Sequence, residues 1–533
     1  MAHDIVFADA LVVDGTGTPG HHASVGVTAG RIASISSEAL SGNRVIDAHG
    51  LVLAPGFIDM HSHSDLRLLA EPDHLAKVSQ GVTLEVLGQD GLSYAPVDDH
   101  VLATLRGQLA GWNDDPPGFD WNWRTVGEYL DRLDTGIAVN AAYLVPQGTV
   151  RMRHVGWDAR PATPSELDGM RADVADGIAQ GAAGMSSGLT YAPGMYADTS
   201  ELVELCRVVA SAGGYYSPHH RSYGAGALDA YAEMVDVARR SGVPLHLAHA
   251  TMNFPLNAGR ALDMLAIVDA GIDDGCDISL DTYPYLAGST YLSALLPSWA
   301  AEGGPATTLA RLSDTDIRER IRVDLEENGS DGCYGVPVDW NWLEINGVRN
   351  AHNEHLVGHT VHDSAIRLGV RPIDLYLDTI LDEHLGTSCL FHVGNEENVR
   401  VIMRHRAHTG GSDGLLVGGR PHPRAWGTFP RYLGRYVREL GILGLAECVE
   451  HLTSRAARRL RLTDRGIVRE GFVADLVLFD PDTIADNATY ENPRQPANGI
   501  HTVLVNGVPV LSDGQLTGSL PGHSIRSHSR DAA

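Results

Sequence analysis

The stretch GFIDMHSHSD, residues 56–65, joins a short apolar run to two histidines that are one residue apart. Short apolar runs bounded by glycine are typical of buried strands. His61 and His63 stand at positions i and i+2 of an extended segment, so both imidazoles project to the same side and can reach one cation. An isolated pair of this kind fits a polar loop as well as a metal site, so the rest of the chain has to decide.

Similar apolar runs recur through the middle of the chain and alternate with helix-like segments, of which 164–180, 199–212 and 225–241 are the clearest. Repeated strand–helix units predict a parallel sheet, and about eight of them predict an α/β fold built on a distorted (β/α)8 TIM barrel. A ninth run, 387–392, is one too many, and the sequence does not say which run lies outside the barrel. The eight other runs are 56–60, 82–87, 138–144, 182–186, 214–217, 244–248, 278–283 and 409–412.

Both ends of the chain read as short strands separated by turns, including 466–469 and 474–479 near the C-terminus. We expect residues 1–55 and 462–515 to form one small β-sandwich domain. Residues 56–461 exceed the roughly 250 residues of a plain barrel, so we expect an insertion, at about 291–370, where the regular alternation lapses. Residues 516–533 form a polar C-terminal tail, which we expect to be frayed from Pro521 onward.

Chemically useful side chains follow four of the predicted barrel strands. His61 and His63 follow the first, His219 the fifth, His249 the sixth and Asp413 the eighth. Active sites of such barrels lie at the C-terminal ends of the strands, where these side chains would meet. Histidine and carboxylate are ligands of catalytic zinc, so the pattern predicts a metal site.

The motifs around these residues resemble the amidohydrolase superfamily, in particular its N-acyl-D-amino-acid deacylase (D-aminoacylase) branch. The resemblance extends over nearly the whole chain, and it implies a barrel with a β-sandwich, bound zinc and hydrolysis of an N-acyl group. The motifs that carry it are GFIDMHSHSD at 56–65, QGVTLEVLGQDGLSYAP at 80–96, GMSSGLTYAPGMYADTSEL at 184–202, DTYPYLAGST at 281–290, GGSDGLLVGGRPHPRAWGTFPRYLGRYVRE at 410–439 and ADLVLFDPDTIADNATYENP at 474–493.

The resemblance also assigns roles to individual residues. His219 and His249 match the histidines of a tight zinc site, and His61 and His63 match those of a second, weaker metal site. Asp413 matches the catalytic aspartate. One or two Zn²⁺ ions are implied, and another divalent metal remains open. The positions that match the lining of a substrate pocket are Tyr191, Tyr283, Ser289 and Arg424, the last facing a substrate carboxylate.

Four positions depart from the branch. Asp90 stands where the branch has a zinc-binding cysteine, and a carboxylate can ligate zinc and bridge two ions. A hard oxygen in place of a thiolate weakens the preference for zinc over other divalent metals. Thr251 replaces a lysine that helps to bind carboxylate, Tyr223 replaces an acid, and Gln147 replaces a histidine after the third strand.

These residues predict cleavage of an amide in a small molecule by metal-activated water, with Asp413 taking the proton and passing it to the leaving nitrogen. Tyr191 is either a donor to the oxyanion or a packing residue, and Arg424 either binds a carboxylate or forms a structural ion pair. The substrate is an N-acyl-D-amino acid or another amide, such as a cyclic imide, lactam, carbamate or acylated secondary metabolite. A non-enzymatic scaffold would be expected to have lost ligands, whereas Asp413 and all four histidines are present here.

Composition narrows the choice of partners and compartment. The formal net charge is −27, so nucleic acid and anionic membrane surfaces are poor partners. The five cysteines are odd in number and form no C-x-x-C pair, which favours a reducing cytoplasm over a disulfide framework. We see no signal peptide and no apolar run near the ~20 residues that a membrane span needs. A homo-oligomer remains possible.

Overall fold

In the computed structural model, which describes residues 2–527, eight parallel strands form the central sheet. The sheet closes between its first and last strands, where the Met60 amide donates to the Gly410 carbonyl at 3.1 Å and Ser62 bridges to Gly414. The predicted α/β barrel is thereby confirmed. In order around the barrel the strands are β6 (Phe57–Asp59), β7 (Val82–Leu87), β8 (Asn140–Pro146), β9 (Gly184–Gly188), β10 (Tyr215–His219), β11 (Leu245–Leu247), β12 (Ile278–Thr282) and β17 (His408–Gly410).

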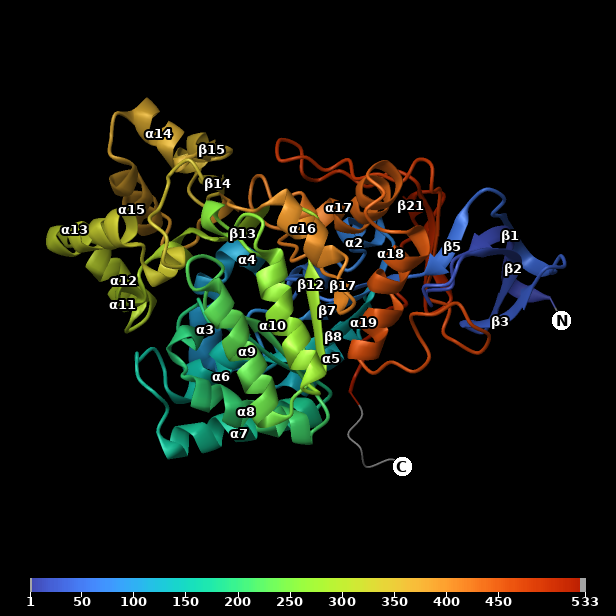
Figure 1. Cartoon of the computed structure of the whole chain (residues 1–533), viewed down its shortest axis with the longest axis horizontal. Helices are drawn as coiled ribbons and strands as arrows, with labels where there is room; N and C mark the ends of the chain where they lie inside the picture. The colour runs from blue at the N-terminus through green and yellow to red at the C-terminus, as the bar shows by residue number, and fades with distance from the viewer. Residues whose placement is uncertain (1, 528–533) are drawn as a thin grey trace.

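Helices cover the outside of the barrel between successive strands (Figure 1). Local sequence signals fix where they begin: Thr163 and Glu166 form a capping box, and the Asp198 side chain accepts from the Glu201 amide. Among residues 2–527, no helix combines the length and the apolar content needed to cross a bilayer. The main covering helices are α7 (Pro164–Ala179), α8 (Thr199–Ser211), α9 (Ala227–Ser241), α10 (Ala261–Asp273) and α16 (Glu396–Met403).

The ninth apolar run is the one outside the barrel. It forms β16 (Ser388–His392), which pairs antiparallel with β13 (Ala287–Tyr291) and β14 (Leu343–Gly347) in a separate four-stranded sheet completed by β15 (His359–Thr360). This sheet starts before residue 291 and ends after 370, so the inserted lobe is wider than expected. Its helices form the yellow-brown lobe in Figure 1 and are α11 (Ser298–Ala301), α12 (Pro305–Leu312), α13 (Thr315–Val323), α14 (Val361–Leu368) and α15 (Pro372–Asp382).

The two ends of the chain meet in one nine-stranded sheet, joined where β5 (Val52–Pro55) pairs antiparallel with β18 (Leu476–Phe479). The strand expected at 466–469 is wrong, because these residues form bends and an extended connection. The other strands of this sheet are β1 (His3–Val12), β2 (His21–Thr28), β3 (Arg31–Ser36), β4 (Gly42–Asp47), β19 (Ile500–Val505), β20 (Val508–Ser512) and β21 (Gln515–Leu516).

The expectation of a frayed tail is wrong for residues 521–527. Ala141 on β8 donates to the His523 carbonyl and accepts from the Ile525 amide, and the Ser524 hydroxyl donates to Asp134 at 2.9 Å. These contacts hold the segment against the barrel because they satisfy backbone groups of the neighbouring strand. The rest of the expected frayed tail, 528–533, lies outside the described residues.

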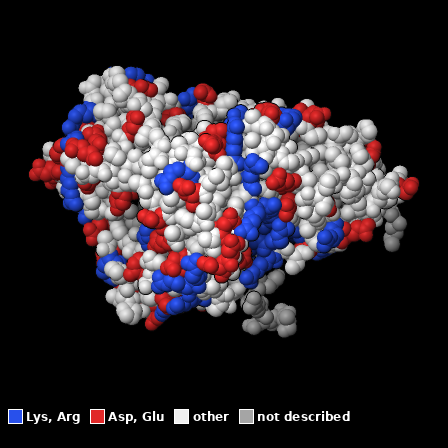
Figure 2. Space-filling model, viewed as in Figure 1, with Lys and Arg blue, Asp and Glu red and all other residues white. Residues whose placement is uncertain are grey.

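Surface charge is mixed in spite of the acidic composition. On the face shown in Figure 2, a band of basic residues gathers over α19 (Ser454–Arg459). Arg455 and Arg458 pair with Glu450, and Arg459 pairs with Asp277. Two carboxylates, Glu450 and Asp277, therefore offset part of the positive charge of these three arginines.

A buried ion cluster ties together the strands that close the barrel. Lys77, on α2 (Leu75–Val78), lies 2.5 Å from an Asp59 carboxylate oxygen and 3.4 Å from Glu85, and all three side chains are fully buried. The Lys77 ammonium also donates to the Ser412 hydroxyl at 2.8 Å, and Asp59 accepts from the Ser412 amide at 2.8 Å. The cluster thus connects β6, β7 and the end of β17.

We predict that Lys77→Met destabilises the fold strongly. Removing one partner of a buried ion pair leaves the carboxylates of Asp59 and Glu85 without their cation, which costs about 3–5 kcal/mol. Urea unfolding followed by circular dichroism measures the loss. Arg239→Ala, which removes an exposed pair with Asp274, is the matched control and should leave the urea midpoint unchanged. An equal midpoint for Lys77→Met and wild type would contradict the assigned role of the cluster.

Candidate metal centre

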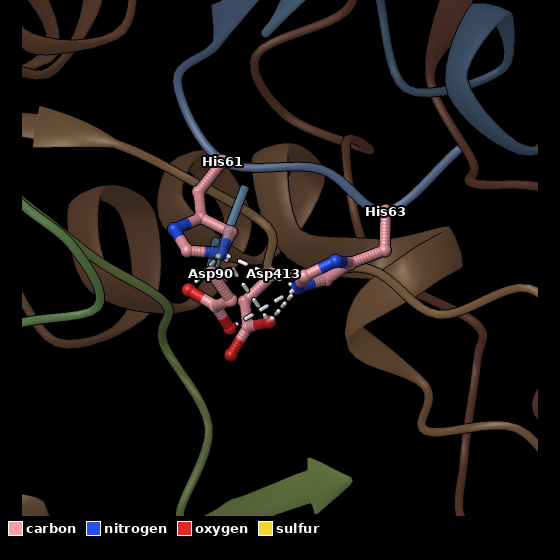
Figure 3. Close-up of side chains that lie close together, drawn as sticks. All are labelled: His61, His63, Asp90 and Asp413. Atoms are coloured by element: carbon pink, nitrogen blue, oxygen red, sulfur yellow. Dashed lines mark hydrogen bonds and ion pairs between the residues drawn. The ribbon is translucent and has the colours of Figure 1, made fainter. Parts of the chain in front are cut away.

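The structure brings all the predicted metal ligands to one end of the barrel. His61 and His63 follow β6, Asp90 follows β7 and Asp413 follows β17, and Figure 3 shows these four side chains converging. His219, the last residue of β10, and His249, two residues beyond β11, complete the set. All six side chains are at least nine-tenths buried, so they meet in a largely dry site. The set is His61, His63, Asp90, His219, His249 and Asp413.

Asp90 is the potential ligand that the two halves of the site share. One of its oxygens, Oδ1, lies 3.5 Å from His61 Nε2 and 3.4 Å from His249 Nε2. The other, Oδ2, lies 3.5 Å from His63 Nε2 and 3.4 Å from His219 Nδ1. Two sets of potential ligands therefore overlap at this carboxylate, one made of His61, His63, Asp90 and Asp413 and the other of Asp90, His219 and His249.

Backbone strain coincides with the site. Asp90, His249 and Asp413 adopt positive φ angles of 54°, 32° and 49°, in or near the left-handed region that side-chain-bearing residues seldom occupy. Such conformations cost free energy and persist where the surrounding structure enforces them, often at functional sites. Each of these residues lies just beyond a barrel strand, where the chain turns away from the sheet.

The donor set fits a divalent metal. Asp90 Oδ1 and His219 Nδ1 are buried and have no hydrogen-bond partner within residues 2–527. Burial alone would raise the pKa of Asp90, but the imidazoles of His61, His219 and His249 lower it well below its usual range. Burial lowers the pKa of His63, but Asp413 and Asp90 raise it to about 9. The buried carboxylates thus require positive charge, which a divalent cation held by neutral imidazoles supplies.

Further side chains orient the ligands. The Thr190 hydroxyl lies 2.8 Å from His219 Nε2, and the Tyr223 hydroxyl lies 3.0 Å from His249 Nδ1, which leaves the other ring nitrogen of each histidine facing Asp90. Such partners fix the tautomer and orientation of metal-binding histidines.

Sequence reasoning missed Thr190 and treated Tyr223 only as a departure from the branch. It also missed Asp281, which lies 3.0 Å from His246 and 3.8 Å from His61 Nδ1. A carboxylate within the predicted barrel strand ISLDT is the signal that could have identified Asp281.

A cavity opens beside the ligands, and aromatic side chains form a large part of its lining. Tyr191, Tyr283 and Ser289 line it, as the sequence predicts, and the Ser289 hydroxyl has no partner among the described residues. Trp112, which the sequence did not identify, also lines it, with its ring 4.8 Å from that of His63.

Arg424 is not among the residues that line this cavity. Its guanidinium is fully buried, lies 2.9 Å from Asp413 Oδ2 and packs against the Tyr283 ring, 4.4 Å from the ring centroid. The structure therefore contains the ion pair that the sequence left as one of two possibilities. Two of its nitrogens, Nε and Nη1, have no hydrogen-bond partner among the described residues.

The substitutions noted in the sequence fall in different places. Thr251 lines the cavity and its hydroxyl donates to Asn253 at 2.9 Å. Gln147 is buried away from the cavity lining and donates to Glu201 at 3.2 Å. Within residues 2–527, no lysine or arginine lines the cavity.

Comparisons with known proteins agree with this geometry. The model of the amidohydrolase family matches residues 44–511. The D-aminoacylase of Alcaligenes xylosoxydans xylosoxydans is 35% identical, with 99% of this chain and 98% of the relative covered. A solved D-aminoacylase structure with a binuclear metal centre is 34% identical and superposes with a TM-score of 0.83, covering 99% of this chain and 100% of the other.

A third relative carries bound metal. The N-acyl-D-glutamate deacylase from Bordetella bronchiseptica, solved with zinc and a phosphonate inhibitor, is 30% identical with a TM-score of 0.84, over 99% of this chain and 100% of the other. The match of the family model and the full-length similarity to these enzymes agree with the ligand set found here. The chain therefore belongs to the amidohydrolase family and is a metal-dependent hydrolase related over its whole length to D-aminoacylase.

Proposed function

We propose that this protein hydrolyses N-acyl-D-amino acids with the help of one or two zinc ions. The observation that carries the proposal is the Asp90 carboxylate, shared between two groups of imidazoles, with Asp413 beside it. Full-length relatives that act on N-acyl-D-amino acids support the choice of substrate. All five cysteines are free thiols, which supports a cytoplasmic location.

A divalent ion in this site supplies Lewis-acid activation of water and of the scissile carbonyl. His219, His249 and Asp90 would hold one ion, and His61, His63 and Asp90 a second. The buried, overlapping ligand sets keep these side chains in place before substrate arrives.

Asp413 moves the proton. Burial alone would raise its pKa, but Arg424, His63 and the other imidazoles lower the pKa well below the usual range, so the group remains a carboxylate. Its Oδ1 lies 3.2 Å from His63 Nε2, at the edge of the ligand set, where it can accept a proton from the attacking water. It then delivers that proton to the departing nitrogen.

Tyr191 acts as a neutral hydrogen-bond donor in the cavity. Burial raises the pKa of its phenol well above the usual range, so the hydroxyl keeps its proton. The hydroxyl lies 3.1 Å from Thr290 Oγ1, which directs it along the cavity wall. We assign it to stabilise the negative charge that develops on the acyl oxygen.

A second substrate class follows from the lining of the cavity. Thr251 stands where the resemblance places a lysine, and Arg424 is already paired with Asp413. An amide without a free carboxylate, such as a cyclic imide, lactam, carbamate or acylated secondary metabolite, suits such a lining. The same ligand set and the same Asp413 would serve either class.

We predict that zinc-loaded enzyme releases amine from N-acetyl-D-amino acids and not from their L-enantiomers. A ninhydrin or fluorescamine assay on a panel of matched pairs measures this directly. Asp413→Asn should lower kcat by about 10²- to 10⁴-fold, the usual contribution of a general acid–base group. Metal content measured in the same samples confirms that the variant remains loaded.

Two outcomes would contradict the assignment. Substantial turnover by metal-loaded Asp413→Asn would remove this residue from the proton-transfer step. The second outcome is that metal-loaded wild type turns over none of the N-acetyl-amino acids but does hydrolyse an uncharged amide. This result would exclude N-acyl-D-amino acids as substrates in favour of the second class.

We predict that Asp90 determines how much metal the protein holds. Asp90→Ala removes the shared ligand and should lower the metal-to-protein ratio after dialysis against a low zinc concentration, as measured by plasma mass spectrometry. Asp90→Cys should retain zinc or bind it more tightly, because thiolate is a softer ligand. Equal metal content in both variants and wild type would show that Asp90 is not a ligand.

We predict that Thr251→Lys improves binding of substrates that carry a carboxylate. A lysine that reaches this anion would lower KM by roughly 10- to 100-fold, the effect of a hydrogen bond to a charged group of about 1.5–3 kcal/mol. Matched N-acyl-amino-acid amides, which lack the charge, serve as the control. An unchanged KM for the free acids would contradict a location of residue 251 next to the carboxylate.

A further inference from the structure

The two histidines that would hold one ion with Asp90 are both supported by neutral hydroxyl groups. His219 Nε2 meets Thr190 Oγ1 at 2.8 Å, and His249 Nδ1 meets the Tyr223 hydroxyl at 3.0 Å. Carboxylates and backbone carbonyls are the more common acceptors for metal-binding histidines. We propose that Tyr223 is a positioning residue, which fixes the tautomer and ring orientation of His249 and thereby sets the metal affinity of this half of the site.

The hydrogen bonds of His249 are compatible with only one tautomer that can bind a metal ion. For His249 Nε2 to present its lone pair towards Asp90 and an ion, Nδ1 must carry the proton and donate it to an acceptor. The Tyr223 oxygen is that acceptor at 3.0 Å.

The Tyr223 ring is itself held on several sides. It packs on His220 with ring centroids 4.1 Å apart and the ring planes tilted by 33°, and it makes T-shaped contacts with His219 at 5.0 Å and Tyr334 at 5.7 Å. The side chain is 3% exposed. A ring packed in this way cannot swing away from His249 without displacing other aromatic groups.

The backbone of Tyr223 is tied to the loop that follows His249. Its carbonyl accepts from the Asn253 amide at 3.2 Å and from the Asn257 side chain at 3.3 Å. The same Asn257 amide donates to the Gly224 carbonyl at 2.8 Å. Tyr223 is therefore anchored to the segment that directly follows His249.

This inference rests on the metal site of the proposed function, but it is tested by metal affinity, which does not depend on which amide is cleaved. The dissociation constant of Zn²⁺ is measured by competition with a chromophoric chelator. Tyr223→Phe keeps the ring and removes the acceptor, and we expect it to weaken zinc binding by about 10- to 100-fold. Tyr223→Glu supplies a carboxylate acceptor and should restore wild-type affinity or exceed it.

Tyr94→Phe is the matched control. Tyr94 is also fully buried, and its hydroxyl has no partner within residues 2–527, so its removal should leave zinc affinity unchanged. Wild-type affinity in Tyr223→Phe would overturn the proposal. A loss in Tyr223→Phe that Tyr223→Glu does not restore would also overturn it, because the loss would then not come from the missing hydrogen-bond acceptor.

A measurement on the unmodified protein covers the case in which a variant fails to fold. In zinc-loaded protein labelled with ¹⁵N-histidine, we expect the ring of His249 to carry its proton on Nδ1, protected from exchange with solvent. His249 is assigned by the signal lost in His249→Gln. A signal showing the proton on Nε2 would overturn the proposal.

Discussion

The candidate site depends on one electrostatic constraint, a buried carboxylate that faces four imidazoles. The Asp90 oxygens lie 3.4–3.5 Å from ring nitrogens of His61, His63, His219 and His249. Such an assembly is unfavourable in a dry site unless positive charge is present, because burial penalises uncompensated carboxylates. One or two divalent cations, each held by Asp90 and the imidazoles on its side, would supply that charge. The same constraint explains why strained backbone at Asp90, His249 and Asp413 is tolerated, since each strained residue contributes a group to the site.

The fold provides the rigidity that this constraint needs. The ligands follow five different strands, and the barrel holds the ends of those strands in register. The first and last strands meet over the buried cluster of Lys77, Asp59 and Glu85, so the segments that carry His61, His63 and Asp413 are fixed relative to one another. Hydroxyls from Thr190 and Tyr223 then set the rotation of individual rings. Barrel closure thus sets the positions of the ligand-bearing segments, and the hydroxyls set the orientation of the rings within them.

Much of this arrangement could be predicted from the sequence. The alternation of apolar runs and turn residues predicted all eight barrel strands. His and Asp residues directly after strands pointed to five of the six side chains that meet at the site, and the resemblance to the deacylase branch added Asp90. The sequence could not say that β16 (Ser388–His392) leaves the barrel, because a short apolar strand looks the same in either sheet. It missed residues 521–527 as part of the fold, since their polar side chains give no sign that the backbone pairs with β8.

The sequence also could not predict which hydrogen-bond or ion-pair partner each polar side chain has in the fold. Lys77, Thr190 and Asp281 come from separate segments, and only the folded chain places them against Asp59, His219 and His61. Arg424 shows the same limit, because its residue type fits both an ion pair and a carboxylate site. The structure places it against Asp413, fully buried and outside the lining of the cavity.

An anomalous-scattering crystal structure of zinc-loaded protein tests the central claim most directly. We predict an anomalous peak within bonding distance of Asp90, His219 and His249, with Asp90 also directed at any second peak beside His61 and His63. Peaks that avoid Asp90, or none at all in crystals grown with zinc, would contradict the shared-carboxylate metal centre.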